Sequence, residues 1–321
     1  MRLMLLDAAS MYFRAFYGVK RPMPAPDGTP TNAVRGFLDM TSNLITRFRP
    51  TDVVACIDQD WRPAWRVALL PSYKTHRLAG PEAAGASGPV MVGGAPPGEA
   101  EPPGLAEQVP IIFDALDALG IATLGAAEHE ADDVVATLAE RATTPVDIVT
   151  GDRDLFQLID DARAVRVLYI ARGVANLERM DAAAVTARYG ITPAQYADFA
   201  TLRGDPSDGL PGVPGIGAKT AAGLLTTFGT LDALLEAAAA HDLRLVRLAG
   251  KLNAARDYLT RAPTVVRTVR TLALPAVDTA LPPAPVDAGR LADLASTWGI
   301  ANTLARATTA LGLDRGQAGP S

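Results

Sequence analysis

Four acidic residues fall within the six-residue segment EHEADD at positions 128–133, which contains no lysine or arginine. An apolar run follows at 134–139, so a helix is predicted to begin near Ala131 with Asp132 and Asp133 in its first turn. The helix dipole favours these charges by about 1 kcal/mol, which is far less than the repulsion between packed carboxylates at low dielectric. A solvated helix start would tolerate them. A buried one requires a cation, and hard divalent ions prefer such oxygen ligands.

More acidic residues follow predicted strands. Apolar runs at 3–6, 52–57, 121–124, 146–150 and 165–170 predict buried strands, and helices predicted between them favour a mostly parallel sheet. Functional sites in such sheets lie beyond the carboxyl ends of the strands. The acids that follow three of these strands should therefore meet the 128–133 segment at one edge: Asp7, Asp58, Asp152 and Asp154.

The predicted fold class is α/β. Residues 1–180 form a mostly parallel central sheet flanked by helices, and residues 181–312 form a helical region, followed by a disordered tail at 313–321. Helices are predicted at 11–17 with Ser10 as N-cap, and at 32–47 and 111–119. The segment 78–110 is rich in Gly, Pro and Ala with few large apolar residues, so we expect a mobile loop inside the first domain.

Two further segments carry chemistry. Residues 61–77 interleave aromatic and basic side chains, which suits base stacking and phosphate contact; a helix with its tryptophans in the core would have the same pattern. Residues 204–220, GDPSDGLPGVPGIGAKT, predict a glycine-rich hairpin between helices that lets a phosphodiester approach the backbone. Ile216 should anchor the turn in the core. The groups expected to reach phosphate or allow its approach are Gly212, Gly215, Gly217, Lys219 and Thr220.

Charge and composition constrain the partners. The formal net charge is −5, but setting aside nine clustered acids leaves +4, which is compatible with a polyanionic substrate. The single cysteine excludes an internal disulfide and is typical of a reducing compartment. No secretory signal and no apolar run of about 20 residues is present, so we expect a cytoplasmic protein without a membrane span. The three histidines are too scattered for a zinc site.

Taken in order, these motifs resemble the bacterial 5′ nucleases, the flap endonuclease or 5′–3′ exonuclease family that also forms the N-terminal domain of DNA polymerase I. The resemblance covers residues 3–311. Ala8 replaces a glycine common in the family, and Gly209 replaces an asparagine. With no polymerase domain following, the free-standing form is expected. The markers are LLD at 5–7 with Arg14, SYK at 72–74 with Arg77, EADD at 130–133, TGDRDLFQL at 150–158, GDPSD at 204–208 and GVPGIGAKT at 212–220.

The resemblance implies a role for each matching residue. The first-metal ligands would be Asp7, Asp58, Glu130 and Asp132. Ligands or neighbours of a second or third ion would be Asp132, Asp133, Asp152, Asp154, Asp205 and Asp208. Lys74 and Arg77 would contact the scissile phosphate, Tyr73 would stack near the terminal base, and Arg14 would contact DNA. The hairpin is similar to the helix-hairpin-helix of the family, in which the carbonyls of Val213 and Ile216 would hold K⁺.

The implied function is hydrolysis of phosphodiester bonds near the 5′ end of flap, nicked or RNA-primed DNA, by a two-metal mechanism with Mg²⁺ or Mn²⁺. We expect a monomer acting in replication and repair, with replication proteins as further candidate partners. Three alternatives stay open at this point. A PIN-like ribonuclease would share the acidic sheet edge but end near residue 150. A non-catalytic DNA-binding module would explain only the hairpin, and a metal-dependent phosphatase only the acids.

Overall fold

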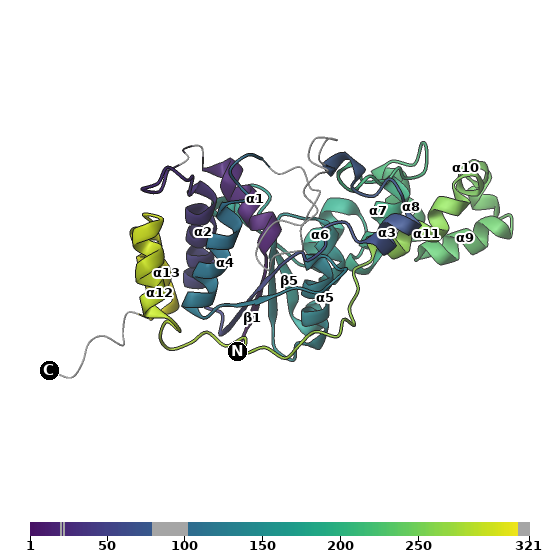
Figure 1. The fold of residues 1–321 in the computed structure, drawn as a ribbon. Helices are drawn as coiled ribbons and strands as arrows, with labels where there is room; N and C mark the ends of the chain where they lie inside the picture. The colour runs from purple at the N-terminus through teal and green to yellow at the C-terminus, as the bar shows by residue number, and fades with distance from the viewer. Residues whose placement is uncertain (20, 22, 79–101, 314–321) are drawn as a thin grey trace.

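The computed structural model describes residues 1–19, 21, 23–78 and 102–313 (Figure 1). Most of the predicted loop at 78–110 and nearly all of the predicted tail at 313–321 lie outside the described residues. Two boundaries differ from prediction. Residues 108–110 already belong to helix α4 (Gln108–Leu119), and Leu313 is buried among apolar side chains. No described helix is long and apolar enough to cross a membrane.

One six-stranded sheet organises the described chain. Its order is β3-β2-β1-β4-β5-β6; the first five strands are parallel, and β6 is antiparallel to β5. The five predicted strands are confirmed to within one residue at each end. Strand β6 was not predicted, because its three residues contain Glu178 and Arg179 and form no apolar run. The strands are β1 (Leu3–Asp7), β2 (Asp52–Cys56), β3 (Ala122–Leu124), β4 (Val146–Thr150), β5 (Val165–Tyr169) and β6 (Glu178–Met180).

The sheet separates two apolar cores. Alternate strand residues point to opposite faces, so Met4 and Leu6 belong to one core and Leu5 to the other. Helices α1 (Ala8–Gly18), α2 (Asn32–Phe48) and α4 cover the first face, and α5 (Ala131–Arg141) covers the second (Figure 1). Asp7, rather than the predicted Ser10, caps α1 by accepting the Ser10 N–H.

The chain after β6 is helical, as predicted, and most of it extends from the α5 side of the sheet (Figure 1). This part also contains short 3₁₀ turns, at Pro193–Gln195 and Leu243–Leu245 among others; a further 3₁₀ turn, Asp154–Leu158, lies between β4 and β5. The α-helices of this part are α6 (Ala182–Tyr189), α7 (Tyr196–Arg203), α8 (Ala218–Phe228), α9 (Leu231–Ala239), α10 (Ala249–Ala254) and α11 (Arg256–Val266); α3 (Ala64–Leu69) packs on α11.

The last two helices do not stay with the helical region, contrary to the predicted 181–312 unit. After α11 the chain runs extended beneath the sheet, where Ala280 bridges Asp52 at the start of β2. Helices α12 (Ala288–Thr297) and α13 (Ala301–Leu311) then pack on α4 and α2. Their apolar faces complete the first core, so the C-terminal segment belongs structurally to the sheet.

Candidate active site

A cavity of about 280 Å³ opens at the carboxyl ends of the central strands. It lies beside the junction of β1 and β4, where the strand order reverses and where open α/β sheets bind ligands. Five acidic and three basic residues border it. They are Asp7, Asp58, Glu130, Asp132 and Asp152, with Lys74, Arg77 and Arg153.

Asp7 occupies the end of β1 and is 4% exposed. Its Oδ1 accepts the Ser10 N–H at 3.1 Å, and its Oδ2 accepts the Thr150 hydroxyl at 2.6 Å. Burial raises the pKa of Asp7 to about 7, and the two hydrogen bonds offset only part of that effect. Thr150 also accepts the Asp152 N–H. The ends of β1 and β4 are therefore tied together at the cavity.

The neighbouring acids are held in the same low-dielectric environment. Burial, followed by the charges of Asp152 and Asp7, raises the pKa of Asp132 well above its ordinary value. Burial likewise raises the pKa of Asp58, whose Oδ1 accepts the Ala131 N–H at the start of α5. These carboxyl groups resist ionisation unless positive charge is supplied nearby.

A second group of acids lies beside the first. Burial, then the charges of Asp152 and Asp208, raises the pKa of Asp154 well above its ordinary value. Asp208 pairs with Arg77 at 3.1 Å. Asp205 does not border the cavity: its Oδ1 accepts the Ser207 N–H, and its Oδ2 pairs with Arg203 at 2.8 Å and with Arg153, which does border the cavity, at 3.4 Å.

Among the described residues, no three acidic, histidine or cysteine side chains converge as a preformed ion cage. Asp7 and Asp58 face N–H donors, and Glu130 pairs with Lys74. The donor set still fits hard divalent cations, since the acids that border the cavity are oxygen donors and burial disfavours the bare charge of several of them. An ion at this place would compete with local donors for the carboxylate oxygens.

Two acids of the EADD segment make a buried ion network, which the sequence did not indicate. Glu130 is the N-cap of α5 and Asp133 its third residue, and they form a reciprocal capping box. Arg66 binds both of them, with Nη2 2.7 Å from Asp133 Oδ1 and Nη1 2.6 Å from Glu130 Oε2. Asp133 Oδ1 also accepts the Val269 N–H. Asp133 therefore has its oxygens engaged away from the cavity, and we no longer assign it to a metal.

Of the two patterns left open for 61–77, Trp61 and Tyr73 follow the one in which large rings lie in the core. Tyr73 and Trp61 are each 4% exposed and pack in or beside the core, so the Tyr73 ring does not present a face for stacking on a terminal base. The Tyr73 hydroxyl instead donates to Glu130 Oε2 at 2.8 Å. Burying these large rings stabilises the core, and this favours a buried position for them over an exposed one that suits base stacking.

Lys74 and Arg77 reach the cavity from the same segment, as the spacing required. Burial alone would lower the pKa of Lys74, but Glu130, Tyr73 and Asp208 together raise it well above its ordinary value, so the ammonium stays charged. Arg14 does not border the cavity: it lies against Gly151 in a neighbouring pocket and donates to the Ala171 carbonyl.

The glycine hairpin connects α7 and α8 and has the predicted form. Val213 and Ile216 are each 2% exposed, and the Val213 N–H bonds to the Leu202 carbonyl at 3.0 Å. The Val213 carbonyl accepts the Ile216 N–H and keeps a second lone pair. Gly212 has φ +66° and presses on the backbone of Arg203, where a Cβ would come within 2.6 Å of the carbonyl carbon.

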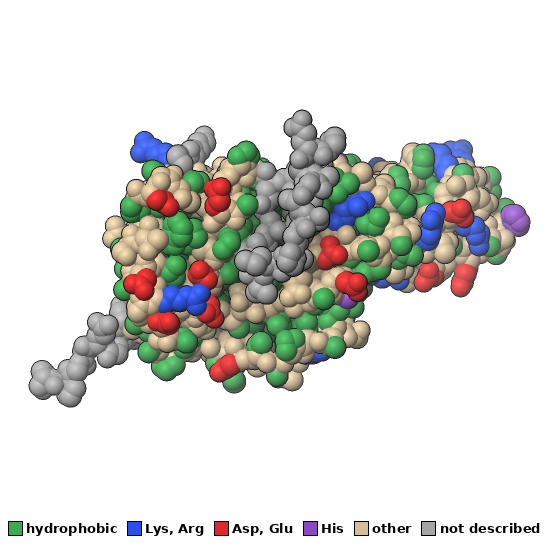
Figure 2. All heavy atoms as spheres, viewed as in Figure 1, with side chains coloured by type: hydrophobic (Ala, Val, Ile, Leu, Met, Phe, Trp, Pro, Cys, Tyr) green, Lys and Arg blue, Asp and Glu red, His purple; other side chains and the backbone are tan. Residues whose placement is uncertain are grey.

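The exposed side of the hairpin carries positive charge. Lys219 is exposed at the start of α8, beside Gly217 and Thr220. Lys251 of α10 lies against Gly215, which has φ +78°. Figure 2 shows further lysine and arginine side chains over α9 and α10 at the same end of the molecule.

Gly209 lies where the loop that carries Asp205 and Asp208 packs closely on the backbone of residues 72–74. Its φ is +70°, and a Cβ there would collide with the Ser72 carbonyl oxygen, while the Asp208 carbonyl accepts the Lys74 N–H at 3.0 Å. We expect Gly209→Ala to lower both stability and cleavage rate. The left-handed backbone alone costs an alanine about 1–2 kcal/mol, and the collision adds to that.

The matched control is Gly312→Ala, at φ +73° with no heavy atom within 4 Å of a new Cβ. Thermal melting and flap cleavage are measured for both. Equal losses of thermal stability and of cleavage in the two variants would contradict the proposal that Gly209 is required for this loop to pack on residues 72–74.

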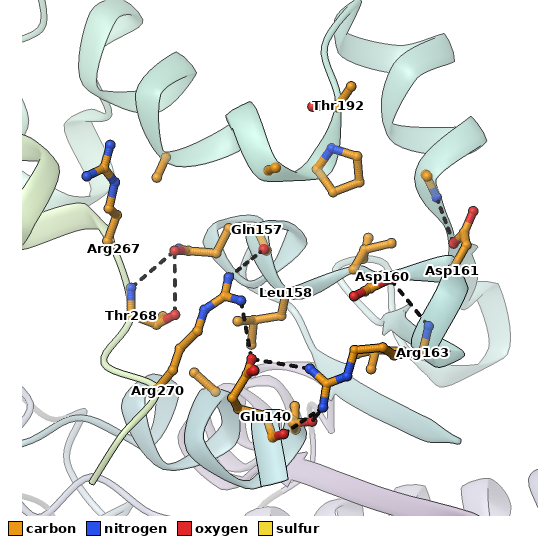
Figure 3. Close-up of a pocket in the computed structure, with 18 residues that line it drawn as sticks. Glu140, Gln157, Leu158, Asp160, Asp161, Arg163, Thr192, Arg267, Thr268 and Arg270 are labelled. Atoms are coloured by element: carbon orange, nitrogen blue, oxygen red, sulfur yellow. Dashed lines mark hydrogen bonds and ion pairs between the residues drawn. The ribbon is translucent and has the colours of Figure 1, made fainter. Parts of the chain in front are cut away.

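A second polar pocket, of about 570 Å³, borders Val165 at the start of β5, the opposite edge of the sheet from the acids. Figure 3 shows Arg163 and Arg270 both directed at Glu140, and Thr268 bonded to Gln157. Arg163 and Arg270 thus share the one carboxylate of Glu140, and Arg267 pairs with Asp198. The sequence-predicted site residues do not line this pocket.

Sequence reasoning missed several residues that support the cavity from behind or at its wall. Arg66 was visible only as one more basic residue of an aromatic segment, and Thr150 only as the end of a strand. Ser10, predicted as a helix cap, accepts the Gly151 N–H at 2.7 Å and so supports the loop that carries Asp152. A polar residue at the end of a buried strand is the signal that could have identified Thr150.

The comparisons with known proteins agree on one family. The family model "5′-3′ exonuclease, N-terminal resolvase-like domain" matches residues 2–190, and "5′-3′ exonuclease, C-terminal SAM fold" matches residues 191–288. A 5′-3′ exonuclease of Streptomyces coelicolor is 54% identical over 309 residues, covering 96% of this chain and 99% of the relative. DNA polymerase I of Mycobacterium bovis is 42% identical over 242 residues, covering 73% of this chain and 24% of the polymerase.

Among solved structures, the bacteriophage T5 D15 flap endonuclease in a complex with DNA and metal ions has the same fold. Its TM-score is 0.60 at 19% identity, covering 83% of this chain and 89% of that chain. A PIN-like protein ending near residue 150 does not account for the matched C-terminal half. From the family models, the relatives and the shared architecture, the chain belongs to the 5′–3′ exonuclease family.

Proposed function

We propose that the chain is a metal-dependent 5′ nuclease that hydrolyses phosphodiester bonds near the 5′ end of flap, nicked or RNA-primed DNA during replication and repair. The observation that carries this proposal is the cavity itself. Acids from four separate segments and three cations, Lys74, Arg77 and Arg153, border one space at the carboxyl edge of the sheet. Carboxylates alone would suit many metal enzymes, whereas the added cations suit a substrate with its own negative charge.

The carboxylates of the cavity would hold two divalent ions, Mg²⁺ or Mn²⁺, or three if the second group of acids takes part. Asp7, Asp58, Glu130 and Asp132 would serve the first, and Asp152, Asp154 and Asp208 the others. When bound, such ions supply Lewis-acid stabilisation of the phosphate and a water nucleophile at neutral pH. Lys74 and Arg77 would stabilise the charge that develops on the phosphate. Lys74 would exchange its Glu130 partner for the substrate.

The hairpin would bind the duplex beside the scissile strand without reading its sequence. Its backbone and Lys219 would contact phosphates, and K⁺ on the carbonyls of Val213 and Ile216 would strengthen that contact. The exposed surface of the hairpin, with Lys219 at the start of α8, supports this proposed contact. The partner is therefore branched or nicked duplex DNA, bound by a monomer in the cytoplasm, with replication proteins as further partners.

Lys219→Ala tests the hairpin contact. We expect weaker flap binding at all sequences, with the slope of log Kd against log salt reduced by about 1, because one phosphate contact is lost. The maximal rate should stay unchanged. Fluorescence anisotropy with labelled duplex at several salt concentrations provides the measurement; an unaltered salt slope would exclude Lys219 from the interface.

The direct test of the function is cleavage of a 5′-labelled flap duplex with and without divalent ion. Wild type is compared with Asp58→Asn and with Asp147→Asn, a fully buried acid that pairs with Arg2 and Arg166 in the body of the sheet. We expect Asp58→Asn and chelation to abolish cleavage and Asp147→Asn to retain it. Cleavage that survives Asp58→Asn and chelation would overturn the proposal.

A further inference from the structure

Arg66 is buried more completely than is usual for arginine. Its side chain is 2% exposed, and it lies on the six-residue helix α3, which packs on α11. Arginine enters a protein interior only with its donors satisfied. The partners of Arg66 therefore indicate the role of its buried charge.

The guanidinium joins three elements. Nη1 and Nη2 bind the Asp133 carboxylate as a fork at 2.9 and 2.7 Å, and Nη1 also binds Glu130 Oε2 at 2.6 Å. Nε donates to the Val265 carbonyl of α11 at 3.0 Å. Burial works against the charge of Arg66, but Glu130 and Asp133 hold its pKa above its ordinary value. Helix α3, the start of α5 and the end of α11 are thus fixed to one another by a single side chain.

The two oxygens of Glu130 have different neighbours. Oε2 is bound by Arg66 and by the Tyr73 hydroxyl, both in the interior. Oε1 is bound by Lys74, which borders the acidic cavity. Asp132 lies between the two residues that Arg66 holds and faces the charges of Asp152 and Asp7. The interior contacts therefore set which Glu130 oxygen and which side of the first turn of α5 face the cavity.

We propose that Arg66 is a positioning residue for the metal-binding acids, acting through Glu130 and through the start of α5. The inference rests on the proposed function, because it requires the cavity to bind a divalent ion. Outer contacts that orient metal ligands typically change metal affinity 10- to 100-fold when they are removed. Arg66 is not a catalytic residue, since the contacts above direct its guanidinium away from the space where substrate would lie.

The test compares Arg66→Lys with Arg166→Lys. Lysine keeps the charge but cannot form the fork. Arg166 makes a similar fork to the buried Asp147, with Nε 2.7 Å and Nη2 3.2 Å from its oxygens, but it lies within the sheet away from the cavity. Mn²⁺ binding to the DNA-free protein is measured by calorimetry, the thermal midpoint is measured in chelator, and the Mn²⁺ concentration for half-maximal flap cleavage is recorded.

We expect both variants to melt earlier, but only Arg66→Lys to weaken Mn²⁺ binding, by about 10- to 100-fold. Tyr73→Phe removes one hydrogen bond from the same Glu130 oxygen and keeps the ring, so it tests the inference even if Arg66→Lys does not fold. It should weaken Mn²⁺ binding by about two- to tenfold. Unchanged Mn²⁺ affinity in Tyr73→Phe, or equal losses in Arg66→Lys and Arg166→Lys, would overturn the positioning role. Absence of Mn²⁺ binding to wild type would instead defeat the proposed function.

Discussion

Asp132→Asn is expected to abolish most cleavage while making the metal-free protein more stable. Asp132 is half-buried, its carboxylate faces the charges of Asp152 and Asp7, and it has no ion-pair partner among the described residues. Losing a ligand to the catalytic ions should lower the cleavage rate by about 10²–10³-fold. Removing one of several crowded, poorly solvated carboxyl groups should raise the free energy of unfolding in chelator by about 0.5–2 kcal/mol.

The pH dependence of stability provides the check on that reasoning. Burial raises the pKa of Asp7 from 3.8 to about 7, so this group stabilises the folded chain fully below pH 3.8 and loses that contribution as pH rises through 7. Thermal midpoints in chelator should therefore fall from pH 6 to pH 8 in wild type. They should fall less in Asp132→Asn, because Asp132 is itself a carboxyl whose pKa is raised, and its own contribution is lost in the same direction as pH rises. Added Mg²⁺ should reverse the fall in wild type. A variant that is both inactive and less stable in chelator would contradict the account.

Lys74→Ala is expected to lower the single-turnover rate by about 10²–10³-fold with little change in flap affinity, because its ammonium would stabilise charge mainly as the phosphate reacts. Lys219→Ala should instead weaken flap binding and leave the rate unchanged. The pairing of Lys74 with Glu130 predicts a further effect: the metal-free variant loses the partner of Glu130 Oε1, so its thermal midpoint should fall in chelator.

Rapid-quench kinetics at saturating enzyme separate the two variants, and Lys74→Arg is the control that keeps the charge. A rate within twofold of wild type for Lys74→Ala would remove this residue from the chemical step. A large rise in Kd without a change in rate would assign it to binding alone.

Sequence reasoning predicted the sheet well because its signals are local. A buried parallel strand needs a continuous apolar run, and the runs ending at Asp7, Asp58 and Thr150 could be found without knowing what surrounds them. The return of α12 and α13 to the sheet could not be found in this way. Which apolar face a terminal helix covers depends on which face the earlier helices leave open.

The same limit applies within the site. Strand ends predicted that the acids approach one another, because parallel strands share a carboxyl edge. Local pattern could not tell Glu130 from Asp133, which lie three residues apart and face different partners. Their separation depends on Arg66, contributed by a helix more than sixty positions away. Tyr73 was misjudged for the related reason that an aromatic residue beside a cation suits both a core and a nucleic-acid surface.

Anomalous diffraction from crystals soaked in Mn²⁺ tests the central claim most directly. The account predicts at least one strong peak in contact with the carboxylates of Asp7, Asp58, Asp132 and Asp152, with the Glu130 oxygen nearest Lys74 turned toward it. A map without a peak in this cavity, in crystals whose protein cleaves a 5′ flap in the same buffer, would contradict it.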